Sequence, residues 1–245
     1  WATTVDTVSL NAGGIAVNLD DPATRRLTFN GDGIAAGITA PTPEMQAALG
    51  GSVGFGLAGL WNAGEPLQLA EFRLEAKALT LALAGAISDF VFDGTAVVEA
   101  SSIAPFSGVA DRRLAGALDL NATGTFSPLI GGFDLVLDGT GTDLRVGDDA
   151  LDAVLQGDVA LAGRVARTAS GIEAEDFRIT NEHLLLAADG TFASTSADFD
   201  FRFDLTDLGL LSEEASGALS VVGQATGKDG PIAIDATTGE VAWDR

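Results

Sequence analysis

Apolar residues occupy every second position through most of this chain, and this alternation constrains its fold more than any other feature. The clearest case is residues 197–205, where Phe199, Phe201 and Phe203 alternate with charged residues. A strand with one apolar and one charged face belongs to a sheet that is solvated on one side, because buried parallel strands are apolar on both sides. Strand signals of this kind, bounded by Gly, Asp or Asn, follow one another every 8 to 12 residues or so. The sequence therefore predicts an all-β protein with few, short helices.

The alternation itself recurs after about 105 residues. Residues 71–74 read Glu-Phe-Arg-Leu, and residues 176–179 read Asp-Phe-Arg-Ile. The apolar pattern of residues 79–85 returns at residues 184–190 in the same way. A long repeat made of strands predicts an elongated array, a curled and solenoid-like sheet in which each unit leaves an apolar face or edge for its neighbour to cover.

The repeat also suggests how the chain is organised. We divide it into lead-in strands with a partial repeat over residues 1–48, a first unit over 49–147 and a second unit over 148–245, all in one continuous array. Helix signals are limited to residues 43–49, with Pro43 at the first helical position, and residues 148–155, with acidic residues in the first turn. The stretch around Pro105 is predicted to be a loop. The apolar parity changes near Lys77 and Ala78 in the first unit and at the matching place in the second, which predicts a turn or bulge there.

Composition argues against several classes of function. The net charge is −22, from 13 Lys and Arg against 35 Asp and Glu, so no basic stripe is present to neutralise nucleic-acid phosphates. No cysteine is present, so neither disulfides nor thiolate metal sites can form. The only histidine is His183, which we place inside a strand at the repeat position of Ala78. A catalytic residue is not expected to be replaced by Ala in the other copy of the repeat. Together with the charge and the lack of cysteine, this predicts that the chain is not an enzyme and has no catalytic residues, metal site, cofactor or nucleic-acid partner.

A sheet with one apolar face and no covering helices must hide that face. It can close as a two-layer sandwich, or it can curl into a trough that holds another apolar molecule. An open trough would expose far more apolar surface than the few hundred Å² that a soluble monomer tolerates, and acyl chains fill such a surface without directional partners. We predict a lipid groove lined by Phe72, Leu74, Leu79, Leu81, Leu118, Leu120, Phe133, Leu135, Leu137, Val159, Leu161, Phe177, Ile179, Leu184, Leu186, Phe199, Phe201, Phe203, Leu219, Val221, Ile232 and Ile234.

The order of several segments resembles a known family. These segments are residues 133–144, 151–161, 177–190, 199–211 and 217–223. Together they resemble the repeating middle of the TamB proteins, the inner-membrane subunits of the translocation and assembly module and relatives of the AsmA-like bridge proteins. The resemblance is best from about residue 49 to the end, and it rests on repeat cadence rather than on a catalytic signature.

The resemblance implies a long periplasmic protein, held in the inner membrane by an N-terminal helix that is missing from this fragment. It implies a β-sheet folded lengthwise into a taco-shaped channel with an apolar inner wall. It also implies phospholipid transport between the two membranes, a role in outer-membrane biogenesis, and an outer-membrane β-barrel partner. The family offers no catalytic residues to assign.

Two other hypotheses fit the same residues. In the first, the chain is a scaffold for outer-membrane protein assembly, with a dry apolar core and open strand edges that pair with incoming strands. In the second, it is a secreted β-helix that adheres to sugars or acts on them. The second is disfavoured because such proteins line a groove with aromatic residues for stacking, whereas this chain has no Tyr and its Trp61 and Trp243 are isolated.

Overall fold

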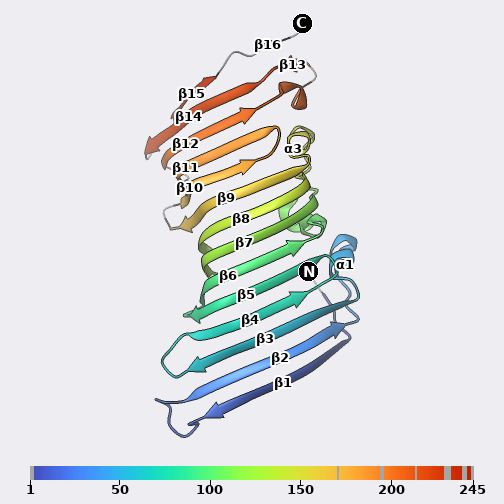
Figure 1. Ribbon diagram of the computed structural model, residues 1–245, viewed down its shortest axis with the longest axis vertical. Coiled ribbons are helices and arrows are strands. Elements are labelled where there is room, and N and C mark those ends of the chain that lie inside the picture. Colours follow the sequence, from blue (N-terminus) through green and yellow to red (C-terminus); the bar gives the residue numbers. More distant parts are fainter. Residues whose placement is uncertain are drawn as a thin grey trace.

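The computed structural model is dominated by one long antiparallel sheet, with short helices along one side of it (Figure 1). It describes residues 3–169, 171–193, 196–212, 214–228, 233–238 and 242–243. Fourteen strands pair in chain order. They are β1 (Thr7–Val17), β2 (Arg26–Ala36), β3 (Ser52–Asn62), β4 (Leu67–Glu75), β5 (Leu79–Ser88), β6 (Val91–Ala100), β7 (Ala115–Ser127), β8 (Gly132–Arg145), β9 (Asp158–Thr168), β10 (Gly171–Thr180), β11 (Leu184–Phe192), β12 (Ser196–Leu205), β14 (Leu219–Lys228) and β15 (Ala233–Thr238).

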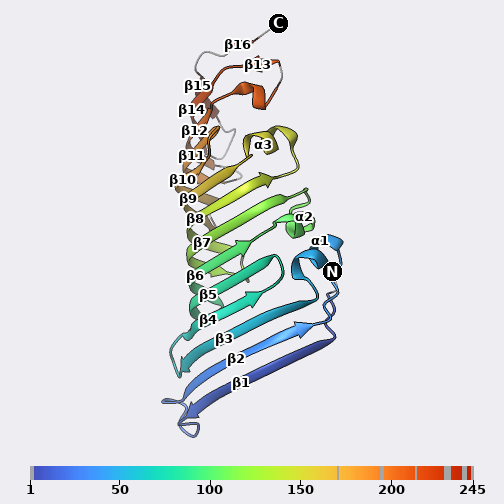
Figure 2. The same cartoon turned by 45° about the vertical axis from the view of Figure 1, so that its right-hand side comes forward.

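The remaining elements are short. Strands β13 (Ala215–Ser216) and β16 (Ala242–Trp243) form a separate two-stranded sheet. The helices are α1 (Pro43–Leu49), η1 (Ala104–Phe106), α2 (Ser107–Ala110), α3 (Asp149–Val154) and η2 (Leu208–Leu210). All of them follow even-numbered strands of the meander, so they gather at one end of the strands, which we call the helix-bearing end (Figure 2). No helix in the described part of the chain has the length and apolar character needed to span a bilayer.

The molecule is extended rather than compact. At about 4.8 Å per strand, a sheet of this many strands is on the order of 65 Å long. The accessible surface is 14928 Å² for a mass of 24.8 kDa, whereas a compact protein of that mass exposes about 10,000 Å². A single sheet without a second layer accounts for the excess.

Local sequence explains the two longer helices. The Thr42 hydroxyl accepts a hydrogen bond from the Met45 amide at 3.2 Å to cap α1, and the Asp148 carboxylate accepts one from the Leu151 amide at 3.1 Å to cap α3. Both helices lie where the sequence predicts them. The loop predicted around Pro105 is wrong, because this residue lies in η1, near the first helical position that proline tolerates.

Two hairpin turns, 105 positions apart in the sequence by the spacing of Leu79 and Leu184, have the same local structure. In the first, the Ala76 amide donates to the Leu79 carbonyl, and in the second the Asn181 amide donates to the Leu184 carbonyl. The turn or bulge predicted near Ala78 is therefore the turn between β4 and β5. His183 lies in the second turn, immediately before β11, and not inside a strand as expected. Its backbone amide donates to the Asn181 side chain at 2.8 Å, which fixes the turn.

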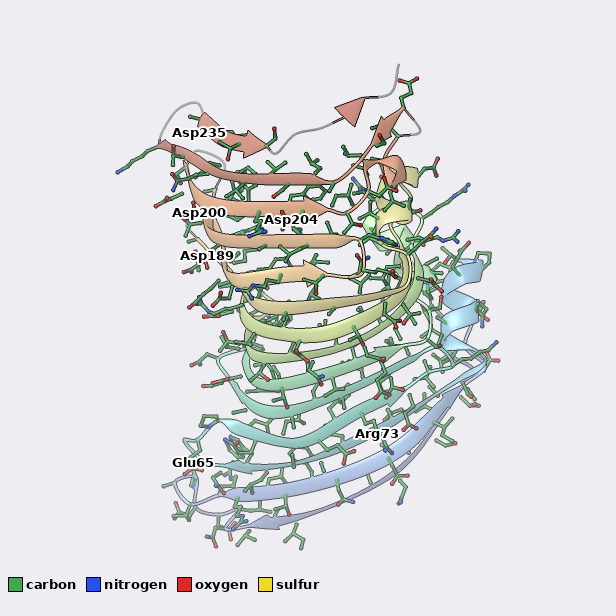
Figure 3. The ribbon with its side chains drawn as sticks, turned by 45° about the horizontal axis from the view of Figure 1, so that its top comes forward. Glu65, Arg73, Asp189, Asp200, Asp204 and Asp235 are labelled. Carbon is green, nitrogen blue, oxygen red and sulfur yellow. The ribbon has the colours of Figure 1, made fainter. Side chains whose placement is uncertain are left out.

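A row of glycines crosses the middle strands. Gly85, Gly94 and Gly124 pair with one another across β5, β6 and β7. A Cβ atom on Gly94 would lie 2.6 Å from the Gly85 Cα, so the backbones approach too closely for side chains. Glycines inside strands are typical of tight bends, and the strands of this region are bowed along their length (Figure 3). We interpret the glycine row as the line along which the sheet bends.

The best-buried cluster lies at the helix-bearing end. Val154 of α3 packs with Leu184, Leu205, Leu208 and Ala215, and Leu205 is only 1% exposed. This cluster fastens α3 and η2 to the sheet. The prediction of an all-β fold with few short helices is confirmed, and the sheet is not closed into a barrel.

Candidate functional site

The pairing register assigns each strand residue to one of two faces. Residues directly opposite each other in an antiparallel pair share a face, and successive residues alternate between faces. Following the pairs from β1 to β15 gives one face that carries Leu10, Phe55, Leu81, Leu135 and Phe201. We call this side the apolar face and the opposite side the polar face. At its paired positions the apolar face carries only glycine and apolar residues, except Arg167 and Thr238.

Every predicted groove residue within the described chain lies on the apolar face. The parity change near residue 78 does not disturb this, because the hairpin turn there brings Leu74 of β4 opposite Leu81 of β5. In the second unit, Ile179 lies opposite Leu186 in the same way. Ile232, the remaining predicted groove residue, lies outside the described residues. That the other predicted groove residues share one face is a finding, whereas their role in holding lipid stays a prediction.

The apolar face also includes residues that were not predicted as groove residues. They are Val8, Leu10, Leu27, Phe29, Val53, Phe55, Leu57, Trp61, Leu67, Leu69, Leu83, Ile87, Phe92, Val98, Phe126, Val165, Ile172, Phe192 and Leu205. Most of them stand in the same alternation as their predicted neighbours, so extending the two-residue pattern through each strand would have found them. Trp61 is therefore not isolated, since it lies opposite Leu27 in this face.

Leu69 and Ala197 of the apolar face are buried far from the helices, but helices cover this face only at the helix-bearing end. There Val53, Ala100 and Val159 are buried. Farther along the strands the face is open, with Leu57 40% exposed, Phe126 43% and Ile172 51%. No second sheet lies over these residues within the described chain.

Aromatic rings fill the gaps that glycines leave on this face. A Cβ atom on Gly223 would lie 2.5 Å from the ring of Phe201, and the rings of Phe29 and Phe55 lie in the same way over Gly59 and Gly33. Phe199 and Phe201 also stack, with ring centroids 6.5 Å apart. Rings that lie over the glycines of neighbouring strands give these parts of the face a hydrocarbon surface.

The polar face holds ion pairs, some between neighbouring strands and others within one strand. Arg164 binds Asp134 with two hydrogen bonds, Nε to Oδ1 at 2.7 Å and Nη2 to Oδ2 at 2.8 Å, and it lies 3.2 Å from Glu175. Arg202 lies 2.6 Å from Asp204 on β12. Acidic residues nevertheless predominate: Figure 3 shows Asp189 and Asp200, which lie directly opposite each other on β11 and β12. This face keeps the sheet hydrated.

The Arg164 pair predicts a pH dependence of stability. Hydrogen bonds from Arg164 lower the pKa of Asp134. A carboxylate with a lowered folded pKa stabilises the fold above the unfolded value of about 3.9, and this contribution is lost as the pH falls through the folded value. We expect Arg164→Gln to lower the urea midpoint at pH 7 by a small amount, with the two proteins converging in acid once the pH falls below the lowered pKa of Asp134. A midpoint difference that is the same at both pH values would contradict this.

The Asp- and Gly-containing segment from Asp138 to Asp143 lies in β8. Asp138 pairs there with Asn121 and Ala162 on the neighbouring strands. Among the described residues, no group of three or more His, Cys, Asp or Glu side chains is arranged to hold a metal ion.

The fold and its two faces define a class of molecule: an extended, one-layer antiparallel sheet with one apolar and one acidic face. No family model, curated protein or solved structure matches the chain. The case for a function therefore rests on the chemistry of the two faces.

Proposed function

We propose that this chain holds phospholipid acyl chains on its apolar face and conducts them along the sheet. One observation carries the proposal: the apolar face continues through all fourteen strands, and no second layer covers it within the described chain. An acyl chain gains about 0.8 kcal/mol for each CH₂ group that it buries and needs no hydrogen-bond partner. A smooth hydrocarbon surface suits such a ligand, whereas a polar substrate would leave its hydrogen-bonding groups unsatisfied there.

In this proposal the sheet is a repeat-built trough and the apolar face is its interior. The glycine row supports this shape because it provides a bend across the middle strands. The helix-bearing end supports it because α3 and η2 pack against Leu184 and Leu205, which belong to the apolar face. The proposed setting is the one that the family resemblance implies. The trough would lie in the periplasm as part of a longer protein anchored in the inner membrane, and it would act with an outer-membrane β-barrel partner without catalysis.

The test is the lipid content of the purified protein. We expect mass spectrometry of a gentle organic extract to detect phospholipid, and native mass spectrometry of the intact protein to show a reproducible number of lipids per chain. A lipid-free dimer would mean that two copies cover each other's apolar faces, which would contradict the proposal.

A lipid-free and stable monomer would contradict it too and would favour the assembly-scaffold hypothesis. The described chain offers two edges for such pairing, because β1 and β15 lie at the ends of the sheet and all of their residues are exposed. Capture of an outer-membrane β-barrel protein by the lipid-free chain would support that reading.

A further inference from the structure

One charged side chain interrupts the apolar face. Arg167 is the last residue of this face in β9, where it lies opposite Phe133 of β8 and Ile172 of β10. The same row continues through Phe126 on one side and Phe192 on the other. It runs along the ends of the strands that lie away from the helices. Arg167 therefore lies on the rim of the apolar face, between aromatic and aliphatic side chains.

Arg167 has no acidic partner among the described residues, unlike four arginines of the polar face. Arg73, Arg164, Arg178 and Arg202 each form an ion pair with a carboxylate. Arg167 forms no ion pair or side-chain hydrogen bond with any described residue, although the chain has 35 acidic residues. Its guanidinium group keeps its donors available on the side of the sheet where no acid lies.

Two hollows meet at this side chain. One, of about 540 Å³, is lined by Arg167 with Phe133, Ile172 and Phe192, so its wall is largely apolar. The other, of about 460 Å³, lies between Arg167 and the turn at Gly131. A Cβ atom on Gly131 would lie 3.8 Å from the Arg167 Nη1 atom, so glycine at this position leaves that side of the guanidinium open.

We propose that Arg167 binds the phosphate group of a phospholipid whose acyl chains lie on the apolar face. This inference rests on the proposed function and adds the headgroup to it. The planar guanidinium presents two parallel N–H donors that match two phosphate oxygens. The hydrocarbon surface begins directly beside it at Phe133 and Ile172, so one molecule with an anionic head and apolar tails satisfies both neighbours.

The surroundings favour a phospholipid over a free phosphate ion. A net charge of −22 repels a small anion in water, and a single arginine does not compensate for that repulsion. The adjoining apolar hollow adds nothing to the binding of a free ion. The apolar hollow does bind acyl chains, so the tails of the lipid bring its phosphate group to Arg167.

The test compares two lipids with identical acyl chains, phosphatidylglycerol and the phosphate-free diacylglycerol, each offered from galactolipid vesicles. The protein is separated from the vesicles and the bound lipid is counted by mass spectrometry. We expect the unmodified chain to prefer phosphatidylglycerol about tenfold, since hydrogen bonds to a charged group contribute about 1.5 kcal/mol or more. Arg167→Gln should abolish the preference without changing diacylglycerol uptake, and Arg167→Lys should keep part of it.

Arg178→Gln is the matched control, because it removes the same charge from the polar face of the neighbouring strand. It should leave the preference unchanged, whereas Arg167→Glu should repel phosphatidylglycerol alone. If both lipids bind but Arg167→Gln keeps the full preference, the headgroup site is wrong and the lipid groove stands. If Arg178→Gln removes the preference equally, overall charge is the cause and the site is wrong. If the unmodified chain takes up neither lipid, the groove and the headgroup site both fail.

Discussion

Phe201→Asp is expected to lower the phospholipid bound per chain about tenfold or more while leaving the sheet folded. The physical reason is that the apolar face has no covering layer. Without lipid, the new carboxylate faces water, and the loss of one aromatic contact in a strand costs about 1 kcal/mol. With lipid, the carboxylate must be desolvated against hydrocarbon or the acyl chains must leave, and the charge has no partner on this face. The measurement is bound lipid by mass spectrometry, with circular dichroism to check folding.

The matched control for this variant is Val222→Asp. Val222 is 51% exposed and lies on the polar face, directly opposite Arg202 on β12. The change introduces the same charge into the same part of the sheet, and the carboxylate there lies next to an arginine. Val222→Asp should therefore keep its lipid. If Phe201→Asp prevents folding while Val222→Asp does not, the apolar face is a dry core that something covers, and the groove is wrong.

The alternation was sufficient to predict the fold class and to assign residues to faces. Within each strand the two-residue period decides which side chains share a side, so Phe199, Phe201 and Phe203 were certain to lie together if that segment is a strand. The hairpin at residues 76–78 shows why the prediction also held across a parity change. A turn of three residues reverses the chain and returns the apolar residues to the same face, so Leu74 and Leu81 become neighbours.

Other features depend on contacts that no local pattern contains. Arg167 stands at an apolar position of the alternation, and its lack of an acidic partner follows from which residues lie opposite it on β8 and β10. His183 was misplaced because the period-two pattern of β11 begins only at Leu184, and propensity alone did not mark the turn before it. The absence of a second layer is likewise a property of the whole sheet. The sequence left the sandwich and the trough open as alternatives, because both require the same alternating strands.

The two faces also place opposite demands on the same strands. The polar face must stay hydrated in a chain that has 35 acids against 13 bases, and short-range pairs such as Arg164 with Asp134 balance part of its charge. The apolar face must remain smooth and uncovered. A single layer meets both demands only if its backbone bends without help from a second layer. The glycine row provides such a bend.

Gly124→Ala is expected to destabilise the sheet by about 3 kcal/mol, which is large for the addition of one methyl group. Gly124 has a φ of +140°, a conformation that residues with a Cβ atom rarely adopt. A Cβ atom there would overlap the carbonyl oxygen of Asp134 and lie 3.2 Å from the Leu135 Cα, so β7 and β8 would have to separate. The measurement is the urea midpoint, followed by circular dichroism.

Gly56→Ala is the control for this change. Gly56 lies on the polar face of β3, and its Cβ atom would lie 4.0 Å from the Arg73 Cβ, an ordinary contact. This variant should be as stable as the unmodified chain or slightly more stable, because alanine reduces the conformational entropy of the unfolded state. If the two variants lost equal stability, the glycine row would have no special place in the sheet. If Gly124→Ala alone is unstable and also loses its lipid, the bend and the lipid-holding surface depend on the same backbone.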